Sequence, residues 1–122
     1  MSELASIEQL TTDYFRSLHE GDLETIRRLY HPACMLMCGD GRDINTMTMA
    51  QYLEVVSERV PPKEAGQPLF GSVVSIDLAG SETAMVKVNS AVQPRFFEDY
   101  LTLAKEAGAW KIVAKVYRVI SS

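Results

Sequence analysis

The chain has 122 residues, of which 47% are hydrophobic, and it carries a formal net charge of -4. This length suits a single domain with a substantial core, and we expect residues 1–122 to form it. The acidic balance argues against a nucleic-acid partner and against an anionic membrane surface, because both attract basic faces. No window approaches the roughly 18 consecutive apolar residues of a spanning helix, and no basic leader precedes an apolar run, so we expect a cytoplasmic protein.

The N-terminal part predicts two helices. Apolar residues at helical spacing predict a first helix over residues 4–18, with Tyr14 on its inward stripe. Gly21 supplies a stop signal, and Asp22 supplies an N-cap for a second helix over residues 23–30. A His-Pro pair follows directly and disfavours further helix.

A short strand and a third helix are predicted next. Cys34 to Cys38 is an apolar run that precedes a Gly-Asp-Gly turn, which favours a strand on at least one side of the turn. Thr48 and Gln51 form a T-x-x-Q capping box, which predicts a helix that continues to about Arg59. Two prolines end this helix.

The remainder is rich in strand signals separated by short turns. The predicted strands cover residues 69–78, 83–92, 95–105 and 110–120. Neighbouring strands with short connections form an antiparallel meander and not the alternating helix and strand pattern of a parallel sheet. The expected fold class is therefore α+β, with helices first and a curved antiparallel sheet after them.

Asp99 is the most informative residue of the strand over residues 95–105. Side chains alternate between faces of a strand, so Phe97, Asp99, Leu101 and Leu103 share one face on which Asp99 is the only charge. A buried carboxylate is costly unless it is paired, hydrogen-bonded or protonated, and such a cost points to a partner or a task. The alternative is that it bonds a neighbouring strand and fixes the register alone.

The last strand offers candidate partners for Asp99 but leaves its own orientation open. Lys115 and Tyr117 share a face with Val113 and Val119. The opposite row consists of Trp110, Ile112, Ala114, Val116 and Arg118. Both rows are mostly apolar, as expected if one lines a pocket and the other forms a subunit interface.

The spacing of the two cysteines and the absence of familiar motifs argue against a disulfide, a metal site and a bound cofactor. Cys34 and Cys38 would lie about 13 Å apart on a strand, which is too far for a disulfide. A metal shared with His31 is an alternative, but free cysteines are commonly plain buried residues, and we expect no metal. No P-loop, G-x-S-x-G, H-E-x-x-H, C-x-x-C or G-x-G-x-x-G occurs, so we expect no cofactor.

Two stretches carry a resemblance to a known family. Residues 97–103 (FEDYLTL) and 110–117 (WKIVAKVY) resemble the F-x-D-Y-L-x-L and W-K-I-x-x-K-x-[FY] stretches of the putative lumazine-binding family. The order of helices, turns and strands resembles the nuclear transport factor 2-like (NTF2-like) superfamily, which has a cystatin-like fold, over essentially the whole chain. SnoaL-like and ketosteroid isomerase-like proteins are similar more distantly.

The resemblance implies a cone in which three N-terminal helices pack on a strongly curved mixed or antiparallel sheet that encloses a pocket. The convex face of such a sheet often dimerises. Ketosteroid isomerase uses an aspartate base with a tyrosine and a protonated aspartic acid that bind an oxyanion. By this resemblance Tyr14 and Asp99 match the two donors, whereas Cys38 stands where the base would fall. A neutral thiol is a poor base, so steroid isomerisation is not expected.

Three functions remain open. The first is a homodimeric small-molecule-binding domain, dimerised through the outer sheet face, whose pocket residues are Tyr14, Cys38, Phe97, Asp99, Leu101, Lys115 and Tyr117. The second is a cofactor-independent isomerase, cyclase or dehydratase that acts on a carbonyl compound, with Asp99 as acid or base and Tyr14 as hydrogen-bond donor. The third is a non-catalytic dimerisation module whose cavity is closed by side chains. The sequence does not name the ligand.

Overall fold

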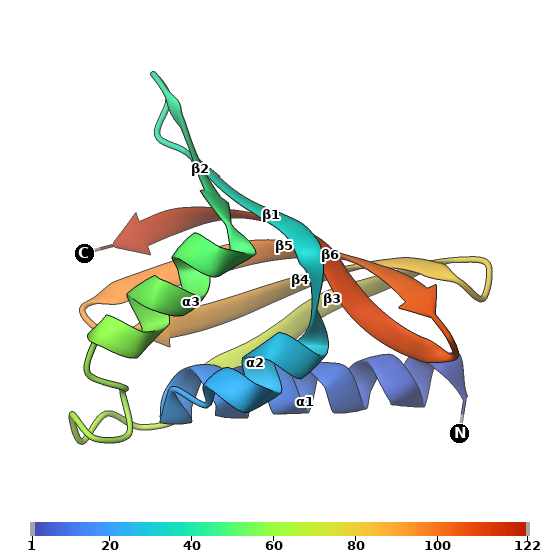
Figure 1. The fold of residues 1–122 in the computed structure, drawn as a ribbon, viewed down its shortest axis with the longest axis horizontal. Coiled ribbons are helices and arrows are strands. Elements are labelled where there is room, and N and C mark those ends of the chain that lie inside the picture. The colour runs from blue at the N-terminus through green and yellow to red at the C-terminus, as the bar shows by residue number, and fades with distance from the viewer. Residues whose placement is uncertain (1, 122) are drawn as a thin grey trace.

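The computed structural model describes residues 2–121 and has an α+β architecture (Figure 1). In chain order its elements are α1 (Glu3–Glu20), α2 (Leu23–Leu29), β1 (Tyr30–Gly39), β2 (Ile44–Thr48), α3 (Met49–Glu58), β3 (Gly71–Ala79), β4 (Thr83–Val92), β5 (Arg95–Glu106) and β6 (Ala109–Ser121). The three predicted helices and the four C-terminal strands are confirmed with small shifts at their ends.

The helix ends follow from local capping chemistry. Gly21 ends α1 in the left-handed conformation, with φ of 66°, which costs glycine little because it has no Cβ. The Asp22 side chain then accepts a hydrogen bond from the Thr25 N–H at 3.2 Å and starts α2. At α3, Thr48 and Gln51 cap each other's backbone N–H groups at 3.2 and 2.9 Å, which confirms the predicted capping box.

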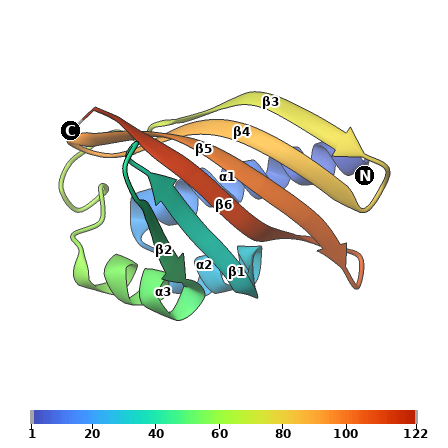
Figure 2. The ribbon, with the colours of Figure 1, turned by 90° about the horizontal axis from the view of Figure 1, so that it is seen from above.

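The six strands of the described chain form one sheet in the order β2-β1-β6-β5-β4-β3. The meander β3 to β6 is antiparallel as predicted, and β1 joins it by pairing parallel to β6 (Figure 2). The sheet is therefore mixed. β2 was not predicted as a strand: it is five residues long, mostly exposed, and leads straight into the cap of α3. Its only strand partner in the described chain is β1.

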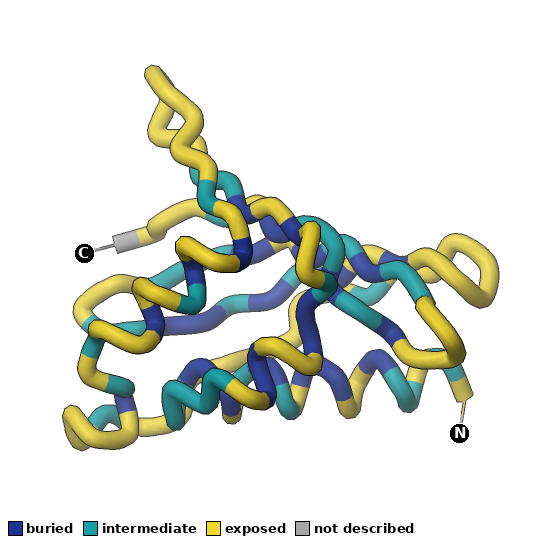
Figure 3. The backbone as a smooth tube through the Cα atoms, viewed as in Figure 1, coloured by how far each residue is buried: buried dark blue, intermediate teal, exposed yellow. Residues whose placement is uncertain are grey.

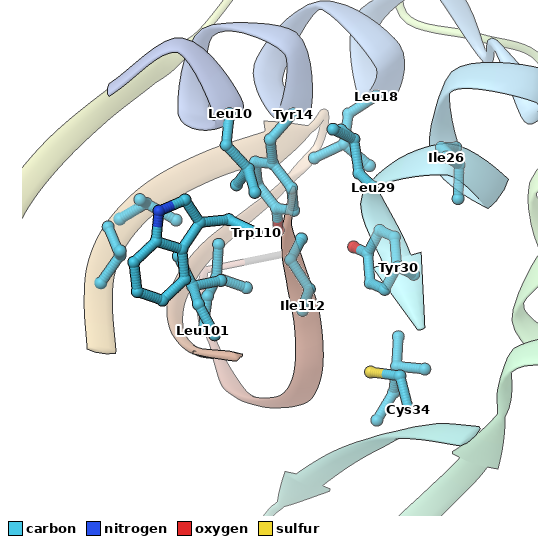
Figure 4. Packing of buried hydrophobic residues seen from close by; sticks show 14 of the residues in the cluster. Leu10, Tyr14, Leu18, Ile26, Leu29, Tyr30, Cys34, Leu101, Trp110 and Ile112 are labelled. Atoms are coloured by element: carbon cyan, nitrogen blue, oxygen red, sulfur yellow. The ribbon is translucent and has the colours of Figure 1, made fainter. Parts of the chain in front are cut away.

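The helices cover one face of the curved sheet. α1 packs against β3, β4 and β6, and α3 packs against β1 and β2 (Figures 1 and 2). The β1–β2 hairpin projects from the body of the molecule and is largely exposed (Figure 3). Between the helices and the sheet lies a core that includes Tyr14, Leu101 and Ile112, all without exposed surface (Figure 4).

A β-bulge in β6 decides which of its residues face the helices. Pairing with β5 skips Val113, which is an extra residue in β6. Trp110 and Ile112 are buried before the bulge, and Lys115 is buried after it. The prediction that Lys115 shares a face with Val113 and lies opposite Ile112 was wrong, because strict alternation assumes a strand without an inserted residue.

Candidate functional site

A cavity of about 470 Å³ lies between α3, the β1–β2 hairpin and the concave face of β4, β5 and β6. Its volume falls within the range of about 300–1,000 Å³ that is typical of small-molecule sites. Apolar side chains form much of its wall, among them Leu36, Met47, Val55, Val92, Phe97 and Val119. Val92, Arg95 and Val119 are among the lining residues, so the cavity reaches the end of the sheet that holds the β4–β5 turn and the C-terminal part of β6.

The structure divides the predicted site residues into two groups. Those that line the cavity are Cys38, Phe97, Lys115 and Tyr117. Those that are buried outside its lining are Tyr14, Asp99 and Leu101. Leu101 belongs to the apolar core, whereas the other two residues of the second group form a polar cluster beneath the cavity wall.

Asp99 is 1% exposed and accepts two hydrogen bonds on one oxygen. The Tyr14 hydroxyl donates to Asp99 Oδ2 at 2.9 Å, and the Ser90 hydroxyl donates to the same atom at 2.8 Å. Oδ1 is buried and has no hydrogen-bond partner among the described residues. Of the three possibilities named for a buried carboxylate, the structure shows hydrogen bonding, with one partner on α1 and one on β4 and neither of the candidate partners on β6.

Ser90 was missed by the sequence reasoning, although a signal was present. In β4 the buried residues Ala84, Val86 and Val88 alternate with more exposed ones, and Ser90 continues the same row. Ser90 also lines the cavity, so it is the member of the Asp99 cluster that a bound molecule could touch.

The Tyr14 hydroxyl proton is directed to Asp99. Desolvation, followed by the negative charge of Asp99, holds the pKa of Tyr14 well above its ordinary value. The resemblance to ketosteroid isomerase implies that a tyrosine and an acid both donate to a ligand oxygen. Here the acid accepts the tyrosine's hydrogen bond, so the Tyr14 hydroxyl proton is directed to Asp99 Oδ2 and not to a ligand.

Lys115 is only 6% exposed, yet it lines the cavity. Its Nζ lies 5.2, 5.3 and 5.5 Å from the ring centroids of Tyr14, Tyr52 and Tyr117. These distances suit cation–π attraction. No hydrogen bond or ion pair within 4.0 Å joins Lys115 to another residue in the described part of the chain. A direct salt bridge between Lys115 and Asp99 is therefore absent from residues 2–121.

The protonation of Lys115 follows from opposing effects. Burial removes water from the ammonium and by itself lowers the pKa of Lys115. The electrostatic influence of Tyr52, then of Asp99 and Tyr117, outweighs burial and raises that pKa above its ordinary value. The side chain is thus an ammonium at neutral pH.

Two arginines of the cavity were not predicted as site residues. Arg59 caps the C-terminal end of α3, and Arg95 begins β5, yet both side chains line the cavity. Arg59 Nη2 is buried and has no hydrogen-bond partner among the described residues. Residues at the ends of two elements give no periodic signal in the sequence, so only the tertiary arrangement brings them together.

The two cysteines of the described chain are both free. Cys34 is buried, and desolvation raises the pKa of its thiol to about 11, which disfavours the reactive thiolate. Cys38 lines the cavity and is free. Residues 2–121 contain no group of three His, Cys, Asp or Glu side chains placed to hold a metal ion. Nor is any helix within them long and apolar enough to cross a bilayer.

Asp40 is a carboxylate that lines the cavity from the β1–β2 hairpin. Its Oδ1 accepts hydrogen bonds from the backbone N–H groups of Arg42 and Asp43, each at 2.9 Å. The bonds from Asp43 and Arg42 lower the pKa of Asp40 and so weaken it as a base. The Asp40 carboxylate therefore mainly stabilises the turn between β1 and β2.

The fold is similar to several solved structures. An NTF2-like protein of unknown function from Shewanella baltica matches with a TM-score of 0.85 and 19% identity over 98% of this chain and 95% of that one. An NTF-2 like protein of unknown function from Silicibacter pomeroyi matches with a TM-score of 0.78 and 21% identity over 95% and 94%. A ketosteroid isomerase-like protein from Erwinia carotovora atroseptica matches with a TM-score of 0.73 and 19% identity over 98% of both chains. These identities establish the fold alone.

No curated protein matches the chain. The family model described as "Putative lumazine-binding" matches residues 2–118, which is nearly the whole chain. The chain therefore belongs to the putative lumazine-binding family and has the NTF2-like fold.

Proposed function

We propose that this protein binds a small organic molecule in the cavity between α3 and the sheet. The observation that carries the proposal is the cavity of about 470 Å³, whose wall combines apolar side chains with polar and charged ones. This combination is typical of sites that take up small molecules. The family's description points in the same direction.

In this proposal Asp99 anchors the polar part of the site indirectly. It holds the Tyr14 and Ser90 hydroxyls in place, and Ser90 lines the cavity. A polar group whose own partner is fixed can present its remaining hydrogen-bonding capacity in one direction. A bound molecule would then meet Ser90 and Lys115, with Asp99 behind them.

Binding has more support than proton transfer at a carbonyl compound. Cys38 lines the cavity at the position where the resemblance to ketosteroid isomerase implies a carboxylate base, so this carboxylate is missing from the chain. The Asp40 carboxylate is occupied by its own turn. The Tyr14 hydroxyl is engaged with Asp99 and does not line the cavity.

A cavity-filling substitution tests the proposal. Val119→Trp is expected to abolish ligand stabilisation, because Val119 lines the cavity and is 40% exposed, so that the larger ring can be accommodated without rupturing the core. Val74→Trp is the matched control, since Val74 is 52% exposed on β3 and does not line the cavity. The measurement is a thermal-shift screen of aromatic heterocycles, flavins and enones. A compound that stabilises both variants equally would place the site elsewhere.

We also propose that the protein is a homodimer through the outer face of the sheet. This face carries exposed apolar side chains from three adjacent strands, namely Met85, Tyr100, Val116 and Ile120. An ion pair of Arg118 with Glu98, at 2.6 Å, lies among them. Contiguous exposed apolar surface is characteristic of an interaction site, and a second copy would cover it with the same surface.

Charging the outer face tests the dimer. Val116 is 49% exposed, so Val116→Glu should leave the monomer folded while it buries an unpaired carboxylate in the proposed interface. Light scattering coupled to gel filtration is expected to give a dimer for the wild type and a monomer for this variant. Ile44→Glu, on the 70% exposed side chain of β2, should remain dimeric. A wild-type monomer at micromolar concentration would refute the interface.

A further inference from the structure

The cavity contains three cationic side chains without ionic partners. Lys115, Arg59 and Arg95 line the cavity, and none of them forms an ion pair with another described residue. Lys115 is more than nine-tenths buried, and its three N–H groups have no hydrogen-bond acceptor within residues 2–121. Cation–π contacts with three tyrosine rings and the negative charge of Asp99 favour the ammonium form of Lys115, and its N–H groups remain available to an acceptor on a ligand.

The charges around the cavity do not cancel. The three cations face two carboxylates, because Asp40 lines the cavity and Asp99 lies behind it. One positive charge is left over. The positive charge of Arg59 by itself lowers the pKa of Lys115, although the other effects raise that pKa overall, as expected for two cations that line one cavity. A single negative charge between them would relieve this repulsion.

We infer that the ligand is a small organic monoanion, such as an aromatic carboxylate, whose charged group lies beside Lys115 and Arg59. The inference rests on the proposed binding function and specifies the class of molecule. The aromatic rings of Phe97 and Tyr117 meet edge to face, with centroids 5.8 Å apart, and both line the cavity. They offer a flat molecule an apolar wall on which its ring can stack.

Because Lys115 is buried, we expect it to contribute strongly to the affinity for an anionic ligand. A hydrogen bond between an ammonium and a carboxylate is stronger in a water-poor site than on a surface, because the local dielectric constant is low. The ammonium form of Lys115 suits anion binding and not attack on a carbonyl carbon, since nucleophilic lysines need a free amine. Arg59 adds a second cationic side chain to the lining of the same cavity.

A pair of probes of equal shape tests the inference. We expect isothermal titration calorimetry at pH 7.5 to show that 2-naphthoate binds at least about tenfold more tightly than 2-naphthamide, which has the same ring and no charge. Equal affinities would overturn the anionic ligand and leave the proposed binding function intact. Failure of both probes to bind would count against both proposals, because the cavity would then not accept an apolar ring of this size.

Variants locate the source of the preference. Lys115→Met keeps most of the side-chain length, and it should weaken 2-naphthoate by about tenfold to a hundredfold with little effect on 2-naphthamide. The matched control is Lys111→Met on the same strand, whose Nζ donates to the Arg28 carbonyl outside the cavity. The Lys111→Met variant should keep the wild-type preference for 2-naphthoate over 2-naphthamide. Equal losses of affinity in both variants would overturn the placement of the anionic group beside Lys115.

Two further measurements guard against a misfolded variant. Arg95 is exposed, so Arg95→Met is expected to fold and to lose part of the preference for 2-naphthoate. The ratio of the affinities for 2-naphthoate and 2-naphthamide is also measured on the wild-type protein alone, so it does not depend on the folding of any variant. An Arg95→Met ratio that equals the wild-type ratio would remove this arginine from the site and weaken the charge balance on which the inference stands.

Discussion

Replacement of Asp99 by alanine is expected to lower the free energy of unfolding by about 3–5 kcal/mol. The change leaves the Tyr14 and Ser90 hydroxyls buried without their acceptor. It also removes the negative charge that helps Lys115 to remain protonated in the interior. Urea denaturation followed by circular dichroism measures the loss.

Asp99→Asn is the conservative control for this prediction. The amide keeps the volume and one acceptor oxygen, so at least one of the two hydroxyl groups retains a partner. Its cost should be about half that of the alanine variant or less. If Asp99→Ala proves as stable as the wild type, the hydrogen bonds to Tyr14 and Ser90 contribute nothing to the fold, and Asp99 cannot be the anchor of the polar cluster.

Replacement of Trp110 by alanine is the second large expected effect, again about 3–5 kcal/mol. Trp110 is 7% exposed and belongs to the same core cluster as Leu10 (Figure 4). Its Nε1 donates to Glu3 at 3.2 Å, and Lys105 lies over its ring while pairing with the same glutamate. The alanine variant loses the packing of the ring and one of the two side-chain links between Glu3 on α1 and the β5–β6 hairpin, while the Lys105–Glu3 pair remains.

Two controls separate these contributions. Trp110→Phe keeps an aromatic ring and loses the hydrogen bond, so most of the stability should remain. Trp110 does not line the cavity, so a folded Trp110→Phe variant should bind 2-naphthoate with wild-type affinity. Chemical denaturation and calorimetry on the same sample check both statements. A larger loss in Trp110→Phe than in Trp110→Ala would contradict the packing argument.

Much of the fold could be predicted because its signals are local. The caps at Asp22 and Thr48 depend on residues three positions away, and the apolar stripe of α1 needs only helical spacing. The inward position of Asp99 followed from alternation along a regular strand, since β5 pairs with β4 without interruption at this point. These features do not depend on which other elements lie nearby.

The candidate site could be predicted only in part because it depends on non-local arrangement. The bulge at Val113 moved the inward row of β6, and no residue type in the sequence marks it. Arg59 and Arg95 are far apart in the chain, and only the closure of α3 over the sheet brings them to one cavity. The same arrangement puts Asp99 behind the cavity wall, a depth that alternation cannot predict.

A crystal structure of the protein grown with 2-naphthoate tests the central claim most directly. The proposed function and the charge balance predict the naphthalene ring in the cavity between α3 and the sheet, with its carboxylate within hydrogen-bond distance of Lys115 Nζ. Density for 2-naphthoate only on the outer sheet face, with the cavity closed by its own side chains, would contradict the account.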